Sequence, residues 1–370
     1  MPRRRAVLAA AAALAGAACV ARMADATAQA PEAAAPLRLS VAVGPALPLG
    51  KGAQRWGELL REGGDAAIAT RLHPGASLAG RDAARELAAL AEGRADLAVG
   101  SSLAWSLQVP ALGVFSLPWF APDDAQLASL AADAELLALL ASRFAAAGAT
   151  LVAVGPLGHR AIATTATTLR APEDLAGLRL RTVPTPLLQE VLLALGARPQ
   201  TLAFAQVQAA LEGGALDGLE GAPTSLAAAR PLAGSQRHLT DLRGVGEAMV
   251  FAVRTAVWDA WTPAQRTLAR EAAERAIRET DAPQREQAAL RQMAAQGTAV
   301  LRLTAAGQRA FRDATAPVAA RWRGAIGDDV VARAERVLAP PAPAAGDAAA
   351  SPSPVAPSAA PSPDAPAARP

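Results

Sequence analysis

An arginine at the end of an apolar strand is the residue of this chain best suited to chemistry. Arg181 ends a short apolar run and is followed by Pro184 and Pro186, two residues that favour a turn. A guanidinium offers a rigid fork of donors that matches the two oxygens of a carboxylate, and it stays charged at physiological pH. The segment therefore predicts a binding site for an organic acid. An ion pair with the nearby Glu173 or Asp174 would explain the same arginine without any ligand.

Patterns typical of catalytic sites are absent from the sequence. The three histidines are isolated, with no helical pair and no neighbouring carboxylate cluster that could hold a metal ion. Residues 44–52 contain the glycines of a phosphate loop, but the spacing is one residue too long and Gly52 stands where a hydroxyl is needed. No Gly-x-Ser-x-Gly elbow is present. We therefore expect a binding protein rather than an enzyme, with no cofactor and no metal.

The composition indicates globular domains with cores built from small and aliphatic side chains. Hydrophobic residues make up 52% of the 370 residues, but aromatic residues only 3%, so Ala, Leu and Val must form the cores. The formal net charge is only +3, and basic residues alternate with acidic ones along the predicted helices. The chain therefore lacks the basic patch that nucleic-acid binding requires.

The two ends of the chain differ from the rest. Residues 1–28 have the basic start, apolar run and Ala-x-Ala site of an export signal, and the run is shorter than the ~20 residues that span a bilayer. We expect export to the periplasm, by either the general or the twin-arginine route. Acylation of Cys19, the single cysteine, is the less favoured alternative because a lipobox usually has Leu at the position of Gly16. Residues 340–370 are nearly all Ala, Pro, Ser and Asp, which predicts a disordered tail.

Between these ends, strand-like and helix-like runs alternate in two successive series. The βαβ rhythm predicts an α/β protein with two halves, each built on a largely parallel sheet. In both halves a helix ends at a Glu-Gly step and leads into a strand that carries an aspartate, Asp96 in the first and Asp217 in the second. Later, Thr262 and Pro263 predict the start of a long amphipathic helix that continues toward Met293, with a kink or break at Pro283.

Four segments resemble the solute-binding subunit of TRAP transporters, the dicarboxylate-receptor family. They are residues 73–102, 115–120, 168–186 and 195–225, so the resemblance covers roughly residues 37 to 338. It implies a two-domain periplasmic-binding-protein-like fold with a hinge and a long helix that spans both domains. The expected boundaries are 37–157 plus about 245–285 for domain I, and 158–244 plus about 286–338 for domain II.

The resemblance also implies the residues of the binding site. Arg181 matches the family's principal carboxylate-binding arginine, Arg160 its second arginine, and Phe204 a position that often lines the pocket. A hinge arginine facing solvent is the alternative for Arg160, and plain core packing the alternative for Phe204. Ser101 ends a predicted strand and could donate to a ligand or cap the next helix. Gly221 stands where the family often has a substrate-binding asparagine, so that contact must come from backbone, water or another residue.

We interpret the chain as a periplasmic receptor that closes two domains around a carboxylate-bearing solute. The resemblance implies delivery to the membrane subunits of an ion-driven permease, and a monomeric receptor. The alternative is a sensory receptor of the same fold that presents an organic acid to the extracellular domain of a histidine kinase. Neighbouring genes for a permease or for a kinase would distinguish the two.

Overall fold

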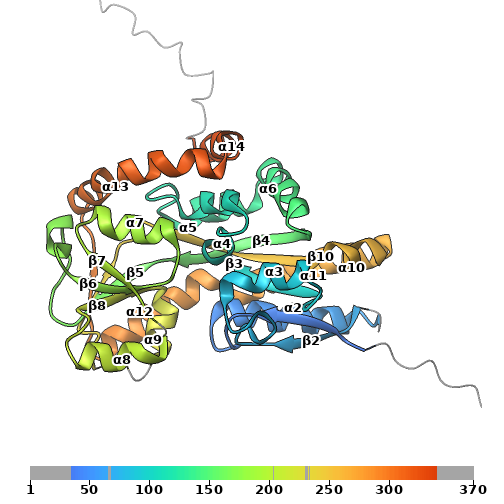
Figure 1. Ribbon diagram of the computed structural model, residues 1–370, viewed down its shortest axis with the longest axis horizontal. Helices are drawn as coiled ribbons and strands as arrows, with labels where there is room; N and C mark the ends of the chain where they lie inside the picture. The colour runs from blue at the N-terminus through green and yellow to red at the C-terminus, as the bar shows by residue number, and fades with distance from the viewer. Residues whose placement is uncertain (1–34, 66–67, 203, 230–231, 233, 340–370) are drawn as a thin grey trace, which may run out of the picture. The chain divides into compact units, whose positions relative to one another are not determined.

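A computed structural model describes residues 35–65, 68–202, 204–229, 232 and 234–339 (Figure 1). The predicted export signal, Cys19 and the predicted tail lie outside these residues. Two β-sheets organise the described chain, and each is covered by helices on both faces.

The first sheet has the strand order β2-β1-β3-β10-β4. Its strands are β1 (Leu37–Val41), β2 (Thr70–His73), β3 (Leu97–Ser101), β4 (Ala149–His159) and β10 (Gly246–Arg254). The second sheet has the order β11-β9-β5-β8-β6-β7. Its strands are β5 (Ala161–Thr164), β6 (Arg179–Thr182), β7 (Arg198–Thr201), β8 (Gly218–Gly221), β9 (His238–Asp241) and β11 (Ala299–Arg302).

Both sheets contain the same parallel core of three strands. The core is β2-β1-β3 in the first sheet and β7-β6-β8 in the second, and the next strand, β10 or β5, runs antiparallel to it. The predicted α/β architecture with two halves is therefore confirmed. The sheets are mixed rather than largely parallel. The chain crosses between the sheets from β4 to β5 and from β9 to β10, and both β5 and β10 run antiparallel to their neighbours. A third crossing, from α11 to α12, leads to β11, which runs parallel to β9.

The helices vary widely in length. They are α2 (Pro48–Glu62), α3 (Glu86–Ala91), α4 (Ser102–Trp105), α5 (Asp124–Ala132), α6 (Ala134–Ala146), α7 (Pro186–Ala194), α8 (Phe204–Glu212), α9 (Pro223–Ala228), α10 (Thr255–Ala260), α11 (Pro263–Thr280), α12 (Ala282–Ala295), α13 (Ala305–Ile326) and α14 (Asp328–Leu338). Short 3₁₀ helices are η2 (Ser77–Ala79), η3 (Ala83–Arg85), η4 (Pro110–Ser116) and η5 (Pro172–Leu175). Within the described chain no single helix could span a membrane; α5 and α6 reach that length and composition only together, and a bend of 65° separates them.

Alternating side chains of the central strands divide each half into two apolar cores. In β3, Leu97 and Val99 pack with α2 and α11 on one face, whereas Ala98 packs with α3, α5 and α6 on the other. In the second sheet, Leu180 faces α7 and α13, and Leu219 faces α8, α9 and α12. This period of two is what a strand buried on both faces requires.

The long helix expected after Thr262 is broken into two, as Pro283 predicted. Thr262 caps α11 by accepting a hydrogen bond from the amide of Gln265, and α11 ends at Asp281, which adopts a left-handed conformation with φ of 47°. Pro283 lies in the first turn of α12, where its missing N–H has no helical partner to lose. Helix α11 packs on α2 and β4, and α12 packs on α9 and β11. The α11–α12 pair therefore packs against elements of both halves.

The two halves repeat one ion-pair motif at equivalent strands. The amide and Nε of Arg38 in β1 both donate to Oδ2 of Asp96, each at 2.9 Å. The amide and Nε of Arg179 in β6 donate in the same way to Oδ2 of Asp217, at 2.8 and 2.9 Å. Each aspartate stands directly before the parallel neighbour of its arginine's strand, so the motif aligns β1 with β6 and β3 with β8.

The domain boundaries expected from the sequence stay a prediction. Helix α14 falls within the expected domain II, but it packs against α5 and α6 of the first half. Its contacts therefore favour placing the end of the described chain with domain I.

We predict that Gly100→Ala destabilises the fold. Gly100 lies in β3 under the buried ring of Trp105, and an added Cβ would stand 1.9 Å from a ring atom. Overpacking of this kind costs about 1–3 kcal/mol of unfolding free energy. Chemical denaturation would measure the loss. Gly44→Ala is the control, because an added Cβ there meets nothing within 4 Å. Equal stability of the two variants would contradict the prediction.

Candidate functional site

A cavity of about 500 Å³ is bordered by residues of both halves, a size that suits a small organic ligand. The first half contributes residues 42–43, 47–49, 81–84, 86, 101, 103–104 and 107. The second half contributes residues 181, 183–185, 201–202, 222 and 224–225, and residues 157, 160 and 247 border the cavity near the crossings between the sheets.

Arg181 reaches this cavity from the carboxyl end of β6. It is half-buried, and its Nε donates to the carbonyl oxygen of Leu202 at 3.1 Å. Burial lowers the pKa of Arg181; the charge of Glu220 opposes this effect and the charge of Arg160 adds to it. A guanidinium in this environment gains more from a bound carboxylate than one in water does, because little solvent competes for its donors.

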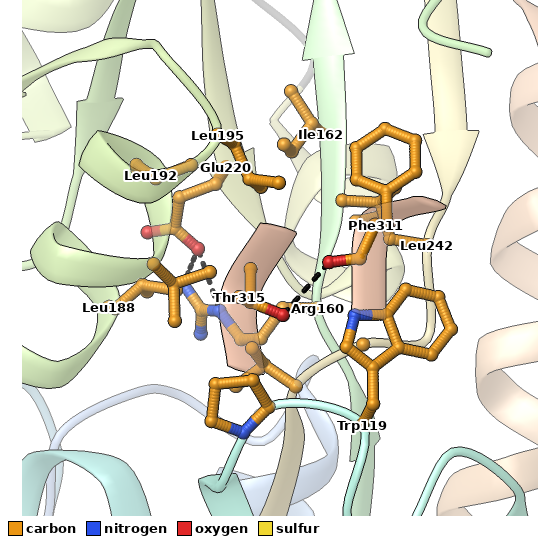
Figure 2. Close-up of a pocket in the computed structure, with 15 residues that line it drawn as sticks. Trp119, Arg160, Ile162, Leu188, Leu192, Leu195, Glu220, Leu242, Phe311 and Thr315 are labelled. Carbon is orange, nitrogen blue, oxygen red and sulfur yellow. Dashed lines mark hydrogen bonds and ion pairs between the residues drawn. The ribbon is translucent and has the colours of Figure 1, made fainter. Parts of the chain in front are cut away.

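Arg160 is held by two carboxylates and also borders the cavity. Its Nε donates to Oε2 of Glu220 at 2.7 Å (Figure 2), and its Nη2 lies 2.6 Å from the same oxygen. Its Nη1 donates to Oε2 of Glu247 at 3.1 Å. Burial alone would lower the pKa of Arg160, but the charges and hydrogen bonds of Glu220 and Glu247 outweigh it and raise the pKa. Only 12% of the side chain is exposed, so Arg160 does not face solvent, although it does lie where the chain crosses from β4 to β5.

Glu220 connects Arg160 to the strand that carries Arg181. Its Oε1 accepts hydrogen bonds from the hydroxyl of Thr182 at 2.9 Å and from the amide of Val183 at 3.1 Å. The carboxylate is buried and uses both oxygens within the protein. Glu220 therefore positions the arginines and is not itself available to a ligand.

The other predicted site residues differ in whether they border the cavity. Ser101 borders the cavity and also caps α4, because its Oγ accepts from the amide of Ala104 at 3.1 Å. Gly221 does not border the cavity; it lies against Leu226, where an added Cβ would come within 3.2 Å. Phe204 is the first residue of α8, and its side chain lies outside what the structure describes. The binding roles of all three stay predictions, and the position of Gly221 argues against a direct one.

Several polar residues of the cavity had not been predicted. Thr224 and Ser225 of α9 border it close to Gly221, where the family's asparagine is missing. Arg81 and Asp82 border it from the first half, and Arg81 has a left-handed backbone with φ of 66°. Glu247 borders it from β10. Nothing in the sequence around Arg81 or Glu247 distinguishes them from ordinary surface residues. The run Pro-Thr-Ser at 223–225, directly after a strand, could have indicated hydroxyl groups that bind a ligand.

Glu86 is the most unusual of the unpredicted residues. It is fully buried at the start of α3, and its Oε1 accepts from the hydroxyl of Ser40 at 2.9 Å. Its Oε2 is buried too and has no hydrogen-bond partner among the described residues. Burial raises the pKa of Glu86 to about 8; the Ser40 hydrogen bond opposes the shift and the charge of Asp82 adds to it. The carboxyl group is therefore neutral at pH 7.

A second, much smaller cavity of about 30 Å³ lies behind Arg160 and Glu220 (Figure 2). Its other walls are mainly apolar and include Trp119 and Phe311. The volume admits a water molecule or two but no organic solute. Trp119 therefore lines a packing defect rather than the larger cavity.

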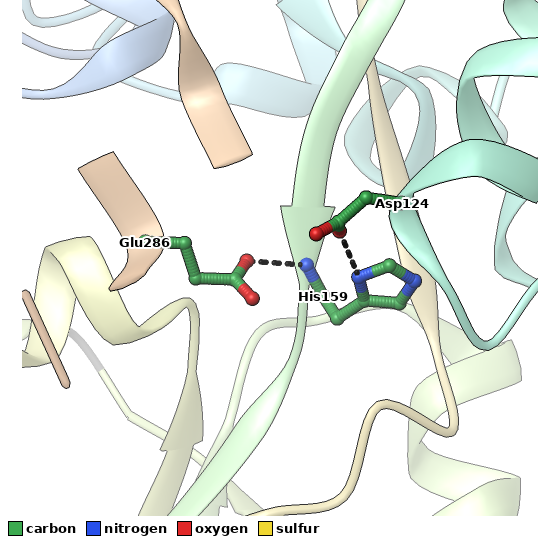
Figure 3. Close-up of side chains that lie close together, drawn as sticks. All are labelled: Asp124, His159 and Glu286. Atoms are coloured by element: carbon green, nitrogen blue, oxygen red, sulfur yellow. Dashed lines mark hydrogen bonds and ion pairs between the residues drawn. The ribbon is translucent and has the colours of Figure 1, made fainter. Parts of the chain in front are cut away.

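Three potential metal ligands gather at the crossings between the sheets, but an arginine lies among them. Oxygen and nitrogen atoms of Asp124, His159 and Glu286 lie within 4.8 Å of one another (Figure 3). Glu286 accepts from the amide of His159 at 2.8 Å and from Nη1 of Arg243 at 3.1 Å, and Nη2 of Arg243 donates to Asp124. We assign Nε2 of His159 as a donor to the Ala121 carbonyl at 2.9 Å, which leaves Nδ1 to accept from Arg243 at 3.0 Å. The guanidinium supplies the positive charge that a metal would otherwise provide.

Comparison with known proteins agrees with this fold. The family model for bacterial extracellular solute-binding protein, family 7 (DctP), matches residues 39–324, and the chain belongs to this family. The resemblance expected from the sequence is thereby confirmed. The family and its solved members bind solutes for transport, which also confirms the expectation of a protein that is not an enzyme.

Two kinds of relatives show how far the likeness extends. The curated C4-dicarboxylate-binding periplasmic protein DctP of Rhodobacter capsulatus is 32% identical over 191 residues, which are 51% of this chain and 56% of that protein. A TRAP periplasmic solute-binding protein of Ralstonia eutropha H16, solved with bound (S)-2-acetolactate, is 36% identical with a TM-score of 0.76, over 82% of this chain and 98% of that one. One of Sulfurospirillum deleyianum, solved with succinate, is 22% identical with a TM-score of 0.71, over 82% and 98%.

We predict that Glu86 makes the free energy of unfolding fall as the pH rises. Its folded pKa of about 8 lies above the ordinary 4.5, so between these values the folded state binds the extra proton. The contribution of Glu86 to stability is then complete below pH 4.5 and declines by up to ~1.4 kcal/mol per pH unit until pH 8. Urea denaturation of the wild type and Glu86→Gln from pH 5 to 8 measures the difference. Parallel curves for the two proteins would show that Glu86 is ionised in the fold.

We also predict that Arg243→Met destabilises the protein strongly. The change leaves the carboxylates of Asp124 and Glu286 close together without their shared cation. Breaking a buried ion pair in this way costs about 3–5 kcal/mol. Arg275→Met is the matched control, because Arg275 pairs with Glu279 on the exposed face of α11, where such a pair contributes little to stability. Thermal denaturation should separate the two variants, and similar melting temperatures would contradict a structural role for Arg243.

Proposed function

We propose that this chain is the periplasmic receptor of a TRAP transporter and binds a carboxylate-bearing solute in the 500 Å³ cavity. The observation that carries the proposal is the position of Arg181, half-buried at the end of β6 and bordering the cavity. The membership of the family supports the transport role. The 28-residue export signal expected from the sequence supports a periplasmic location.

In this proposal Arg181 binds the solute carboxylate and Arg160 assists it. Glu220 contacts Nε and Nη2 of Arg160, and Glu247 contacts Nη1. A guanidinium has five N–H donors, so these three contacts leave two N–H groups, one on each terminal nitrogen, for a ligand. The hydroxyls of Ser101, Thr224 and Ser225 border the same cavity and can hydrogen-bond further oxygens of the solute. Thr224 and Ser225 replace the missing asparagine amide.

The solute we favour is a monocarboxylate that also carries hydroxyl or oxo groups. The support is the 36% identical protein solved with (S)-2-acetolactate, an acid with one of each. The hydroxyl-rich lining of the second half agrees with such a solute. Four-carbon dicarboxylates remain the alternative class, since the Rhodobacter capsulatus relative is named for them.

Delivery of the solute to an ion-driven membrane permease completes the proposal. The chain crosses between the sheets from β4 to β5, from β9 to β10 and from α11 to α12. Such crossings act as the hinge in binding proteins that close around a ligand. A sensory receptor that presents the acid to a histidine kinase would use the same hinge. Neighbouring permease genes would support the transporter and a neighbouring kinase gene the sensor.

We predict that Arg181→Ala weakens solute binding by ~2–5 kcal/mol, at least tenfold in affinity, because a ligand carboxylate loses its buried partner. Arg181→Lys should also bind poorly, because an ammonium group cannot reproduce the two-pronged contact. A thermal-shift screen with organic acids, followed by calorimetry on the hits, would measure both effects.

Arg198→Ala serves as the control for the arginine variants. Arg198 is exposed on β7, beside β6, and does not border the cavity. It should bind like the wild type. Wild-type affinity in Arg181→Ala would refute the arginine site, and no binding of any acid by the folded wild type would refute the receptor function itself.

A further inference from the structure

We propose that Glu86 is a specificity-determining residue of this receptor, which as a neutral acid donates its proton in a hydrogen bond to a hydroxyl or oxo oxygen of the bound solute. This inference rests on the proposed function and goes beyond it, because it names the residue that recognises the hydroxyl or oxo groups of the solute, as opposed to its carboxylate.

The internal repeat shows that an acid at this position is exceptional. In the first half the amides of Gly93 and Ala95 donate to the carbonyls of Leu90 and Ala89; in the second half those of Gly214 and Leu216 donate in the same pattern to Leu211 and Ala210. This common turn aligns α3 with α8. Glu86 then corresponds to Val207, and both side chains are fully buried. One half therefore has an ordinary apolar core residue where the other has a carboxyl group.

The same repeat places Glu86 beside the counterpart of Arg181. The equivalent pairs Arg38–Asp96 and Arg179–Asp217 align β1 with β6, so Ser40 corresponds to Arg181. The hydroxyl of Ser40 donates to Glu86 at 2.9 Å. At equivalent strand positions, the second half thus presents a guanidinium and the first half a serine–carboxyl pair.

Only one of the two carboxyl oxygens of Glu86 has a hydrogen-bond partner among the described residues, which leaves the other able to carry a proton and donate it to a ligand. Oε1 has its partner in Ser40, whereas Oε2 has none among the described residues, and the residue borders the cavity. A buried carboxylate with a single hydrogen bond is costly, so the group keeps its proton. The proton on Oε2 then needs an acceptor, and an oxygen of a solute in the cavity can provide one.

The surrounding charges favour the neutral form during solute binding. Asp82 lies near Glu86 and borders the cavity with Arg81, while Glu247 borders it in its ion pair with Arg160. His73 pairs in register with Ser40 on the neighbouring strand, and burial lowers the pKa of His73, so it is neutral above pH 7. A negative charge on Glu86 would add to those of Asp82 and Glu247 and repel the incoming carboxylate. Burial raises the pKa of Glu86 to about 8, in agreement with this geometry.

The test is calorimetry of the chain purified from the periplasm of an expressing host, at pH 7, 8 and 9. The probes are (S)-2-acetolactate, 2-oxobutanoate and D-erythronate, and the tightest binder is used for the pH series. For a pKa of about 8, the wild type should bind it about tenfold more weakly at pH 9 than at pH 7. Butanoate, or 2,2-dimethylbutanoate for acetolactate, lacks the oxygens and should bind weakly at every pH.

Three variants separate Glu86 from the other titrating groups. Glu86→Gln keeps a donor but cannot ionise, so its affinity should not change with pH. Glu86→Val copies the second half; it should bind about tenfold more weakly than the wild type at pH 7 and lose the preference for the oxygenated acid. Glu92→Gln removes an exposed acid just after the same helix and should behave like the wild type.

The outcomes distinguish this inference from the proposed function. If the wild type and Glu86→Gln show the same pH dependence, or if Glu86→Val keeps the preference for the oxygenated acid, the role of Glu86 is refuted while the receptor function stands. If the wild type binds none of the acids at any pH, the proposed function fails, and the role of Glu86 fails with it.

Discussion

The buried ion pairs of Arg160 are the interaction on which the arrangement of this protein depends. Arg160 lies between β4 of the first sheet and β5 of the second, Glu247 belongs to the first sheet, and Glu220 to the second. One guanidinium therefore ties together strands of both halves at the edge of the cavity. Because a buried charge without its partners is strongly destabilising, this tie fixes where the strand ends can lie, and with them Arg181.

A second group of ion pairs, centred on Arg243, also connects segments that are distant in the chain. Arg243, between β9 and β10, neutralises Asp124 and Glu286 and contacts His159, so each crossing between the sheets contributes a residue to it. The two groups differ in how they relate to the cavity. Arg160 borders it and can respond to a ligand, whereas Arg243 does not border it. The crossings are thus held by ion pairs, while residues at the strand ends border the cavity.

The sequence predicted the fold class, the two halves, the break near Pro283 and the strand that ends near Arg181, because these depend on local patterns: alternating apolar residues, caps, prolines and a family motif. It did not predict Glu86, Glu247 or the partners of Arg160. These depend on which residues distant in the chain meet, and an acid in an amphipathic helix looks the same whether it faces solvent or a core. Gly221 shows the limit of motif reasoning, since the hydroxyls near it, not Gly221 itself, border the cavity.

The repeated frame of the two halves has a consequence for the direction in which a solute lies. A scaffold made of two equivalent βαβ units would offer the same chemistry from both sides and could hold an elongated molecule in either of two orientations. Here the equivalent positions are an arginine in one half and a serine with a buried acid in the other. The divergence of a duplicated pair of strand ends gives the cavity a polarity, so every bound molecule would present the same end to the same half of the protein.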